Sequence, residues 1–418
     1  MFALVDVTSM YASVEKIYNP NLRNKPVMVL SNNDGCVVAA CPIAKRLGFK
    51  KFVPYFQVKE EAKKAGVVVC SSNYELYADV SSKMFSVMAQ FCDELHEYSI
   101  DEAFMRFSPR LNDSEWLALG YEIRKTIWRE VKLPVGVGFG PTPTLAKAAN
   151  HAAKKLDGFR GSAVINTPQE KQALLSRMAV ADVWGIGGRL EKRLMAMGIN
   201  NAYTLSQQSP AKMRKYFSIV LENTVRELQG ELRLAWDEIR PAKKEIYSTR
   251  SFGNRVTTQD ELRAALATHA EIATKKLRAQ HSLAHSATFF AANSPHDDGR
   301  YVKQSALSNF AVPTNDTRHI IHAASEALNK LFIPGVRYYK VGVGLLDIRD
   351  ETNRQDDLFS PSTDNAALMA VLDSTNARYG RNTMHFGARG FQQKFAMKRD
   401  FLTKRATTRW EEIPRIKC

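Results

Sequence analysis

The chain has 418 residues, more than one compact core usually supports, so its length predicts roughly two to four domains. It carries 59 Lys and Arg against 43 Asp and Glu, and this net charge of +16 favours a polyanionic partner such as nucleic acid. No apolar run reaches the ~20 residues that cross a bilayer, and none of the five cysteines forms a CxxC pair. A membrane protein, a zinc ribbon and a disulfide framework are therefore disfavoured. The opening MFALVDV lacks the features of a signal peptide, so we expect a cytoplasmic protein.

Strand and helix signals alternate through residues 1–165. The run Phe2–Val7 predicts a strand and Thr8–Ile17 a helix, and two strands flank the turn at Asp34-Gly35. The predicted elements that follow the first helix are strands Val27–Ser31 and Cys36–Ala40, a short helix ending over Ala44–Gly48, strand Gly66–Ser71, helix Tyr74–Phe91, strands Leu95–Ile100, Ala103–Phe107 and Val135–Phe139, and helix Thr144–Lys155. This order predicts an α+β layer without the strict βαβ alternation of a Rossmann fold.

The rest of the chain divides into three further parts. Residues 168–236 show no clear strand signal and predict a small helical domain, followed by a short basic linker. A second α+β unit follows, with strands over Ala287–Ala292 and Tyr339–Leu346 and helices over Asp260–Gln280 and Thr317–Leu331. Residues 350–418 open polar and acidic and end basic. The sequence therefore predicts an α+β multidomain protein.

Three acids at predicted strand ends are the most informative chemical feature. Asp101 and Glu102 lie between two apolar strand halves, and Asp6 ends the first strand. Buried strands avoid carboxylates unless these are paired or bind metal. Mg²⁺ prefers carboxylate oxygens, and phosphoryl transfer commonly uses two such ions. The spacing alone leaves open the alternative that each acid is a solvated turn residue.

Several motifs, in order, resemble those of the Y-family DNA polymerases. They are Phe2–Glu15, Asn73–Ser81, Tyr98–Phe104, Gly136–Gly138 and Leu145–Lys147. Within the family the chain is most similar to the UmuC group, the catalytic subunits of bacterial DNA polymerase V, through Ser31–Cys36, Asn150–Lys155 and Val183–Gly187. The resemblance covers essentially the whole chain.

The resemblance implies a right-hand polymerase with a C-terminal tail. Its expected parts are a palm (1–16 and 74–167), fingers (17–73), a thumb with a helix-hairpin-helix (168–236), a linker (237–247), an α+β little finger (248–349) and a regulatory, partner-binding segment (350–418). The implied reaction is attack of a primer 3′-hydroxyl on the α-phosphate of a dNTP opposite damaged template, in SOS-type mutagenesis.

The same resemblance assigns roles near the acids. Asp6, Asp101 and Glu102 become the ligands of two Mg²⁺ ions, with the Val7 carbonyl as a further oxygen. Tyr11 matches the steric gate that excludes ribonucleotides, whereas its residue pattern alone favours a core tyrosine. Lys45 and Lys154 match positions that hold the triphosphate, although a helical lysine is usually a solvated residue. Ala39 and Pro42 stand where hydroxyl side chains often bind phosphate, so that affinity is expected to differ.

The DNA-holding residues are expected in the thumb and little finger. Gly185 and Gly187 let the backbone approach a phosphate, and Arg189 opens the next helix. A plain turn is the alternative. Arg250 opens the little finger, and four basic side chains could line DNA or be solvated: Lys275, Lys276, Arg278 and Lys340. The pairs His281/His285 and His319/His322 have ligand-like spacing but no acid or cysteine to complete a set.

The tail carries the expected partner sites. Gln355, Leu358 and Phe359 resemble a sliding-clamp motif, and residues 384–418 resemble a UmuC-type tail, which implies contact with a UmuD′-like dimer and RecA. Two other classes remain open on the residues alone. Another two-metal palm enzyme, a nuclease or cyclase, could use the same acids, and a non-catalytic DNA-binding subunit would need only the basic surface.

Overall fold

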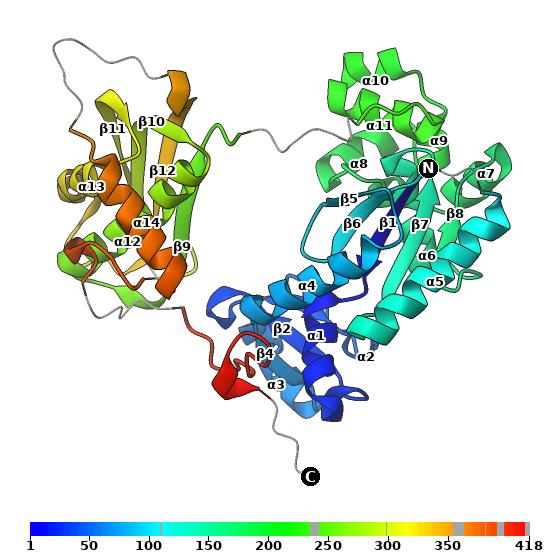
Figure 1. Cartoon of the computed structure of the whole chain (residues 1–418), viewed down its shortest axis with the longest axis horizontal. Coiled ribbons are helices and arrows are strands. Elements are labelled where there is room, and N and C mark those ends of the chain that lie inside the picture. The colour runs from blue at the N-terminus through cyan, green and yellow to red at the C-terminus, as the bar shows by residue number, and fades with distance from the viewer. Residues whose placement is uncertain are drawn as a thin grey trace. The chain divides into compact units, whose positions relative to one another are not determined.

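The computed structural model describes residues 1–108, 111–234, 242–297, 299–353, 363–380, 382–390 and 397–413. The chain divides into two compact units. Unit 1 comprises Met1–Glu238 and Arg399–Cys418, and unit 2 comprises Ile239–Lys398 (Figure 1). The C-terminal segment is therefore shared between the two units, with only its last part returning to unit 1. None of the described helices is long and apolar enough to cross a membrane.

A five-stranded sheet forms the palm of unit 1. Its strands, in spatial order, are β5 (Glu94–Glu97), β6 (Glu102–Arg106), β1 (Phe2–Val7), β7 (Val135–Gly140) and β8 (Ser162–Val164). The central β1 is antiparallel to both neighbours, and β8 is parallel to β7. All four predicted strands of this region are confirmed, and the short β8 is an addition. The N-terminal strand thus lies in the middle of the sheet, where its last residues are held on both sides.

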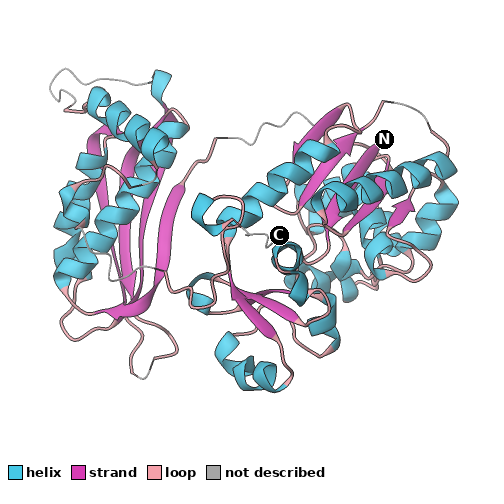
Figure 2. Ribbon diagram, turned by 60° about the horizontal axis from the view of Figure 1, so that its bottom comes forward, coloured by secondary structure: helices cyan, strands magenta, loops and turns pink. Residues whose placement is uncertain are grey.

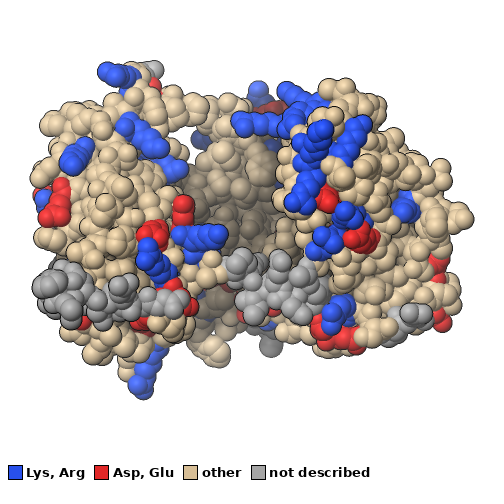
Figure 3. Space-filling view, turned by 90° about the horizontal axis from the view of Figure 1, so that it is seen from above, with Lys and Arg blue, Asp and Glu red and all other residues tan. Residues whose placement is uncertain are grey.

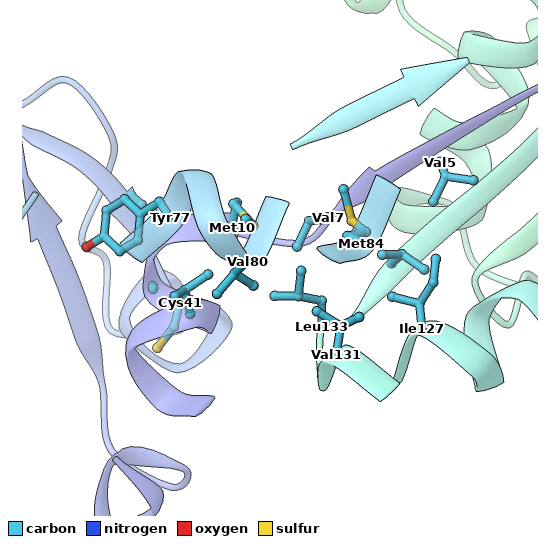
Figure 4. Packing of buried hydrophobic residues seen from close by; sticks show 14 of the residues in the cluster. Val5, Val7, Met10, Cys41, Tyr77, Val80, Met84, Ile127, Val131 and Leu133 are labelled. Atoms are coloured by element: carbon cyan, nitrogen blue, oxygen red, sulfur yellow. The ribbon is translucent and has the colours of Figure 1, made fainter. Parts of the chain in front are cut away.

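Helices cover both faces of this sheet (Figure 2). On one face, α4 (Tyr74–Met88) and α5 (Asp113–Val131) pack against inward side chains such as Val5 and Val137. Figure 4 shows Val5, Val7, Met84 and Ile127 in this core. On the other face, α6 (Pro143–Lys155) approaches β7 closely, because glycines alternate there. A Cβ atom at Gly140 would lie 2.6 Å from the backbone nitrogen of Ala146.

The fingers are a small three-stranded layer that follows α1 (Met10–Tyr18). Their elements are η1 (Pro20–Leu22), β2 (Val27–Leu30), η2 (Asn32–Asp34), β3 (Val37–Ala40), α2 (Pro42–Arg46), α3 (Tyr55–Lys64) and β4 (Val68–Ser71). The sheet order is β3-β2-β4, so β4 is an edge strand. The predicted hairpin is confirmed, and its turn places Asn33 and Asp34 at φ values of 59° and 51°. Asn and Asp tolerate this left-handed conformation better than most residues.

The thumb is helical, as predicted. Its elements are α7 (Pro168–Leu175), η3 (Val180–Asp182), α8 (Gly188–Met195), α9 (Ala202–Ser206), α10 (Pro210–Tyr216) and α11 (Ile219–Gln229). In the described part of this region the β-pairing amounts to one bridge, between Ala179 and Asn201. The thumb core includes Leu145 and Ala149 of α6, so the palm helix belongs to both domains.

Unit 2 is a four-stranded antiparallel sheet with helices packed on it. Its elements are β9 (Ile246–Val256), α12 (Gln259–Ala279), β10 (Ser282–Ala292), β11 (Lys303–Thr314), α13 (Thr317–Leu331), β12 (Tyr338–Asp350), η4 (Glu351–Asn353), α14 (Ala366–Tyr379) and η5 (Gly387–Arg389). The sheet order is β11-β10-β12-β9. The core includes Leu266, Ile320 and Phe289. Arg278 binds Asp373 at 2.7 and 3.0 Å, which attaches α14 to this unit.

Candidate active site

The strand register brings two of the predicted acids together. Asp6 on β1 lies directly opposite Glu102 on β6, and Asp101 immediately precedes β6. The backbone N–H of Val7 donates to the Asp101 carbonyl over 2.9 Å, which extends the pairing past the end of the strands. Because partners in an antiparallel pair project to the same face, Asp6 and Glu102 share one side of the sheet.

That side is the one covered by α6, which supplies two lysines. Lys154 Nζ lies 2.7 Å from Asp6 Oδ1 and 3.3 Å from the Val7 carbonyl oxygen. Lys147 Nζ lies 3.0 and 3.1 Å from the two carboxylate oxygens of Glu102. The lysines are seven residues apart, which is two helical turns, so both project from one face of α6. Each of these acids is therefore neutralised by its own lysine.

The position of α6 depends on the buried side chain of Asn150 and on a glycine, Gly136, in the facing strand. Asn150 donates from Nδ2 to the carbonyl oxygens of Leu4 and Gly136, at 3.0 and 2.7 Å, and so fixes α6 to both β1 and β7. At Gly136, opposite Asp6, a Cβ atom would lie 2.6 Å from Lys154 Cγ. The stem of Lys154 occupies that space and reaches Asp6 through it.

Burial and the neighbouring negative charges raise the pKa values of Asp6 and Glu102. Burial is the largest factor that raises the pKa of Asp6, and the Asp101 charge adds to it, whereas Lys154 lowers the pKa. The pKa of Glu102 is also raised, first by burial and then by Asp6 and Asp101, against the effect of Lys147. Asp101 accepts a hydrogen bond from Ser99 Oγ at 2.7 Å. Additional positive charge at this point would stabilise all three carboxylates.

The chemistry of Asp6, Asp101 and Glu102 suits the binding of a divalent cation. They offer hard oxygen ligands, which Mg²⁺ prefers. The ligand atoms of the three acids do not all lie within 4.8 Å of one another, since the only such group among the described residues is Asp316, His319 and Asp364. Two of the active-site acids are turned to lysines instead, and a cation would have to compete with those lysines.

Tyr11 lies beside the acids on an aromatic support. Its ring stacks on Tyr77 with centroids 4.6 Å apart and packs edge-on against Tyr74 at 5.9 Å. Burial is the first cause that raises the pKa of Tyr11, followed by Tyr74 and the Asp101 charge. The side chain is half-buried and packs against the hydrophobic core of unit 1. The ring is therefore held by two tyrosine rings, at a place where the Asp101 charge still acts on its hydroxyl.

Lys45 is part of a group of cations on the same side. Its ammonium donates to Ser9 Oγ over 3.0 Å, where the chain turns from β1 into α1. Burial first, and then the charges of Lys51 and Lys154, lower the pKa of Lys45. Mutually repelling cations of this kind are stabilised by a bound polyanion. Ala39 and Pro42 add no hydroxyl near them, as the sequence indicates.

Two functional candidates were missed in the sequence. Lys147 appears only within a quoted motif, although its two-turn spacing from Lys154 could have identified it. Trp184 lies in the thumb between η3 and α8, and its ring lies 5.0 Å from Lys147 Nζ. The ring of Tyr98 lies 4.8 Å from the same ammonium, and Trp184 Nε1 donates to the Tyr98 hydroxyl over 3.3 Å. No local pattern pairs a thumb tryptophan with a palm lysine.

The predicted thumb hairpin leads from η3 into α8. Gly185 has φ +87°, which favours glycine, and Gly187 precedes the first turn of α8. A Cβ atom at Gly187 would meet nothing within 4 Å, so the fold itself does not require a glycine there. Arg189 is exposed beside it. Figure 3 shows Lys and Arg side chains gathered on unit 1 on the thumb side. The exposed basic residues of α8 and α10 include Arg189, Lys192, Arg193, Lys212, Arg214 and Lys215.

The basic residues predicted in unit 2 divide into two kinds. Arg250, Lys275, Lys276 and Lys340 are exposed. Arg278 is not free to line DNA, since its guanidinium binds Asp373, the Asn315 carbonyl and Thr317 Oγ1.

The expectation that no acid accompanies His319 is wrong, because Asp316 and Asp364 lie beside it. Asp316, however, already binds the Arg318 guanidinium at 2.7 Å. Gln355, Leu358 and Phe359 lie outside the described residues.

Comparison with known proteins identifies the family. The model of the impB/mucB/samB family matches residues 5–151, and the model of that family's C-terminal domain matches residues 243–358. A third model, of a domain of unknown function, matches residues 366–416. UmuC of Salmonella typhimurium is 44% identical over the full length of both chains, and MucB of Escherichia coli is 39% identical over 99% of each. DNA polymerase IV 2 of Bacillus subtilis is 27% identical over 90% of this chain and 91% of its own length.

Solved structures show the same fold. A chimera of the Y-family DNA polymerases Dbh and Dpo4 has a TM-score of 0.64 at 20% identity, covering 84% of this chain and 100% of its own. An insertion ternary complex of Dbh DNA polymerase has a TM-score of 0.53 with the same coverage. The architecture is therefore that of a Y-family polymerase. The chain belongs to the impB/mucB/samB family of Y-family DNA polymerases, and it is a DNA-directed DNA polymerase of the translesion type.

Proposed function

We propose that Asp6, Asp101 and Glu102, with the Val7 carbonyl, hold two Mg²⁺ ions for primer extension. The observation that carries this proposal is the opposition of Asp6 and Glu102 across β1 and β6, with Asp101 adjacent. In such a site the ions activate the attacking primer 3′-hydroxyl and stabilise the charge that develops on the triphosphate.

The two lysines of α6 would then serve different stages. Lys154 and Lys147 keep Asp6 and Glu102 ionised and in place between turnovers. With metal bound, Asp6 and Glu102 would serve as its ligands, and the ammonium groups of Lys154 and Lys147 would be available for phosphate oxygens. Lys154, together with Lys45, would bind the triphosphate, since a compact ammonium neutralises phosphate charge well.

Sugar choice is proposed to rest on Tyr11. Its ring stacks against Tyr77 and has no room to yield toward that side. A ribose 2′-hydroxyl placed over the ring would clash with it, whereas a deoxyribose would not. This arrangement would favour dNTPs over rNTPs.

DNA is proposed to be held by the backbone rather than by base edges. The Gly185–Gly187 hairpin and Arg189 would bind phosphates from the thumb, and Arg250 would do so from the little finger. The domain boundaries given above are proposed with these roles, except that residues 363–398 belong structurally with the little finger unit.

The tail is proposed to recruit partners. Gln355, Leu358 and Phe359 would bind a sliding clamp, and the C-terminal segment a UmuD′-like dimer and RecA, as the similarity to UmuC along the full length of the chain supports. Since its substrate is DNA, the chain would act in the cytoplasm of a bacterial cell, in SOS-type mutagenesis.

Primer extension on a damaged template tests the proposal. The full chain with UmuD′ and RecA should extend past the lesion only when dNTPs and Mg²⁺ are both present. Degradation of DNA, or cyclisation of a nucleotide, without extension would favour another two-metal palm enzyme. DNA binding with none of these reactions would favour a non-catalytic subunit.

A further inference from the structure

The end of the chain docks on the fingers after leaving unit 2. The described part, residues 399–413, includes η6 (Trp410–Glu412). The N–H of Ser71, on edge strand β4, donates to the Phe401 carbonyl over 3.0 Å, and the N–H of Phe401 donates to Ser71 Oγ over 3.0 Å. The N–H of Asp400 donates to Asp34 Oδ2 over 2.8 Å. Residues 400 and 401 are therefore fixed at the end of β4 by one backbone–backbone hydrogen bond and two bonds to side chains, with the Phe401 ring packed edge-on against Tyr55.

A fully buried asparagine holds the next residues of the tail. Asn73 Nδ2 lies 3.1 Å from Thr403 Oγ1, 3.3 Å from the Thr403 carbonyl and 3.2 Å from the Lys404 carbonyl. Its Oδ1 accepts from the backbone N–H of Leu76 and so caps α4. The Asn73 side chain thus joins the start of α4 to the tail and holds Thr403 in place.

Thr403 donates a hydrogen bond to a buried carboxyl group, that of Glu15. Thr403 Oγ1 donates to Glu15 Oε1 over 3.2 Å, and the Tyr77 hydroxyl donates to the same oxygen over 2.6 Å. Glu15 is 2% exposed, and burial is the main factor that raises its pKa. A buried carboxyl group is stable only when its oxygens are hydrogen-bonded. The tail therefore supplies one of the two side-chain donors that this group has among the described residues.

The same contacts lead to the proposed sugar gate. Tyr77, fixed at its hydroxyl by Glu15, is the ring on which Tyr11 stacks. Glu15 and Tyr11 are one turn apart on α1, so the carboxyl group that binds Tyr77 and the ring that stacks on Tyr77 belong to the same helix. Removing the Thr403 hydroxyl leaves Oε1 with Tyr77 alone, and the carboxyl and the Tyr77 hydroxyl must then readjust together.

We propose that the C-terminal segment positions Tyr11, with Thr403 acting through Glu15 and Tyr77 to set how strictly ribonucleotides are excluded. The proposal rests on the proposed role of Tyr11 as the steric gate. It gives part of the domain of unknown function at residues 366–416 a role in substrate choice. Thr403 is a positioning residue, since it reaches the substrate only through other side chains.

The test compares rNTP with dNTP insertion by the full chain. Thr403→Val keeps the shape but removes the hydroxyl, Thr403→Ser keeps the hydroxyl, and Thr408→Val is a matched control at an exposed position of the same segment. We expect Thr403→Val to raise the rNTP/dNTP ratio of kcat/KM by on the order of threefold to tenfold. Such a change corresponds to only part of the free energy that a hydrogen bond to a carboxylate contributes. Thr403→Ser and Thr408→Val should keep the wild-type ratio.

Tyr11→Ala separates this proposal from the assignment of the gate. If Tyr11→Ala excludes rNTPs as well as the wild type does, the gate assignment fails. If Tyr11→Ala admits rNTPs while Thr403→Val keeps the wild-type ratio, the tail proposal is overturned. A lower melting temperature of Thr403→Val with an unchanged ratio also overturns it, because the contact is then only structural. Thr403→Ala, which cannot overpack, repeats the measurement if the valine variant folds poorly.

Discussion

Glu227 of the thumb accepts a hydrogen bond from the backbone N–H of Thr144 in the palm, with 3.1 Å between Glu227 Oε2 and the nitrogen. This thumb carboxylate therefore completes the first turn of the helix that carries Lys147 and Lys154. Its other oxygen accepts from the N–H groups of Arg233 and Leu234 at 2.8 and 3.0 Å, and the residue is completely buried. Glu227 thus adds a hydrogen bond to the apolar packing that already joins the thumb to the catalytic helix.

Glu227→Ala should destabilise unit 1 by about 2–4 kcal/mol, because the buried N–H of Thr144 and the N–H groups of Arg233 and Leu234 lose their acceptor. Thermal and urea unfolding of the full chain measure this loss. Glu227→Gln, which keeps one carbonyl oxygen, should lose less. Glu61→Ala, an exposed acid on α3, is the matched control and should change little. Equal stability of the Glu227 and Glu61 variants would contradict the capping role.

Asp101→Asn should abolish extension while leaving primer-template binding intact. The amide cannot supply the negative charge that holds a metal ion, so we expect the rate to fall by at least ~10²–10³-fold. Single-turnover insertion and DNA affinity measure the two effects separately. Glu97→Gln, an exposed acid on neighbouring β5, should extend normally. Near-normal extension by Asp101→Asn would remove Asp101 from the metal site.

Arg189→Ala should weaken DNA binding without changing sequence preference. If Arg189 binds a backbone phosphate, its loss should reduce the slope of log affinity against log salt concentration by about 1. Titration of duplexes of different sequence at several salt concentrations measures this slope. Lys125→Ala on α5, on the opposite face of the palm sheet, should keep the wild-type slope. A sequence-dependent loss would mean that Arg189 reads bases.

The stability of the little finger unit should fall between pH 6.5 and 4. Burial first, and then Arg250 and Lys276, lower the pKa of His269 from 6.5 to about 4, and its Nδ1 lies 2.8 Å from Ser248 Oγ. The unfolded chain therefore takes up the proton at a higher pH than the folded chain does. The stability contributed by this site is complete above pH 6.5 and is lost as the pH falls through 4, a change of roughly 3 kcal/mol.

His269→Gln provides the comparison for this pH dependence, because an amide can still bind Ser248 but does not titrate. Unfolding free energies of both proteins, measured at intervals over this pH range, should converge as the pH falls. Parallel curves would show that another group titrates.

Replacing Leu358 and Phe359 with Ala should remove stimulation by a sliding clamp and leave clamp-free extension of short primers unchanged. The reason is that an isolated apolar pair in a polar segment orders on a partner's pocket. Extension with and without clamp, and the melting temperature, are measured on the same protein. Joint loss of basal activity and melting temperature would indicate that the pair packs within the little finger.

The sequence predicted the elements best where apolar periodicity and turn chemistry agree. The helix over Thr317–Leu331 is confirmed at both ends, and the hairpin at Asp34-Gly35 is confirmed. Helix α5 was not predicted, although Asn112 and Glu115 form the capping box that begins it. Strand β11 was not predicted either, because its residues alternate between exposed and half-buried at the edge of the sheet and lack a continuous apolar run.

The site was predictable only in part, because its parts come from distant segments. Resemblance to a family brought Asp6, Asp101 and Glu102 together, and the register of β1 and β6 now gives a physical reason for two of them. The pairing of Lys147 with Glu102 follows from the close approach of α6 to β7, which depends on the glycines of β7. The hydrogen bond of Thr403 to Glu15 joins residues 388 positions apart, and no local pattern encodes it.

The return of residues 399–413 to unit 1 makes the little finger an insertion, attached to the rest of the chain at both of its ends. A single proteolytic cut between the thumb and β9 would therefore leave two fragments that still bind each other through the docked tail. Such docking is intramolecular, so a competing partner must overcome a high effective concentration before it displaces the tail. Deleting the tail would remove both this second attachment and any partner-binding site. A defect of the truncated enzyme could therefore arise from either loss.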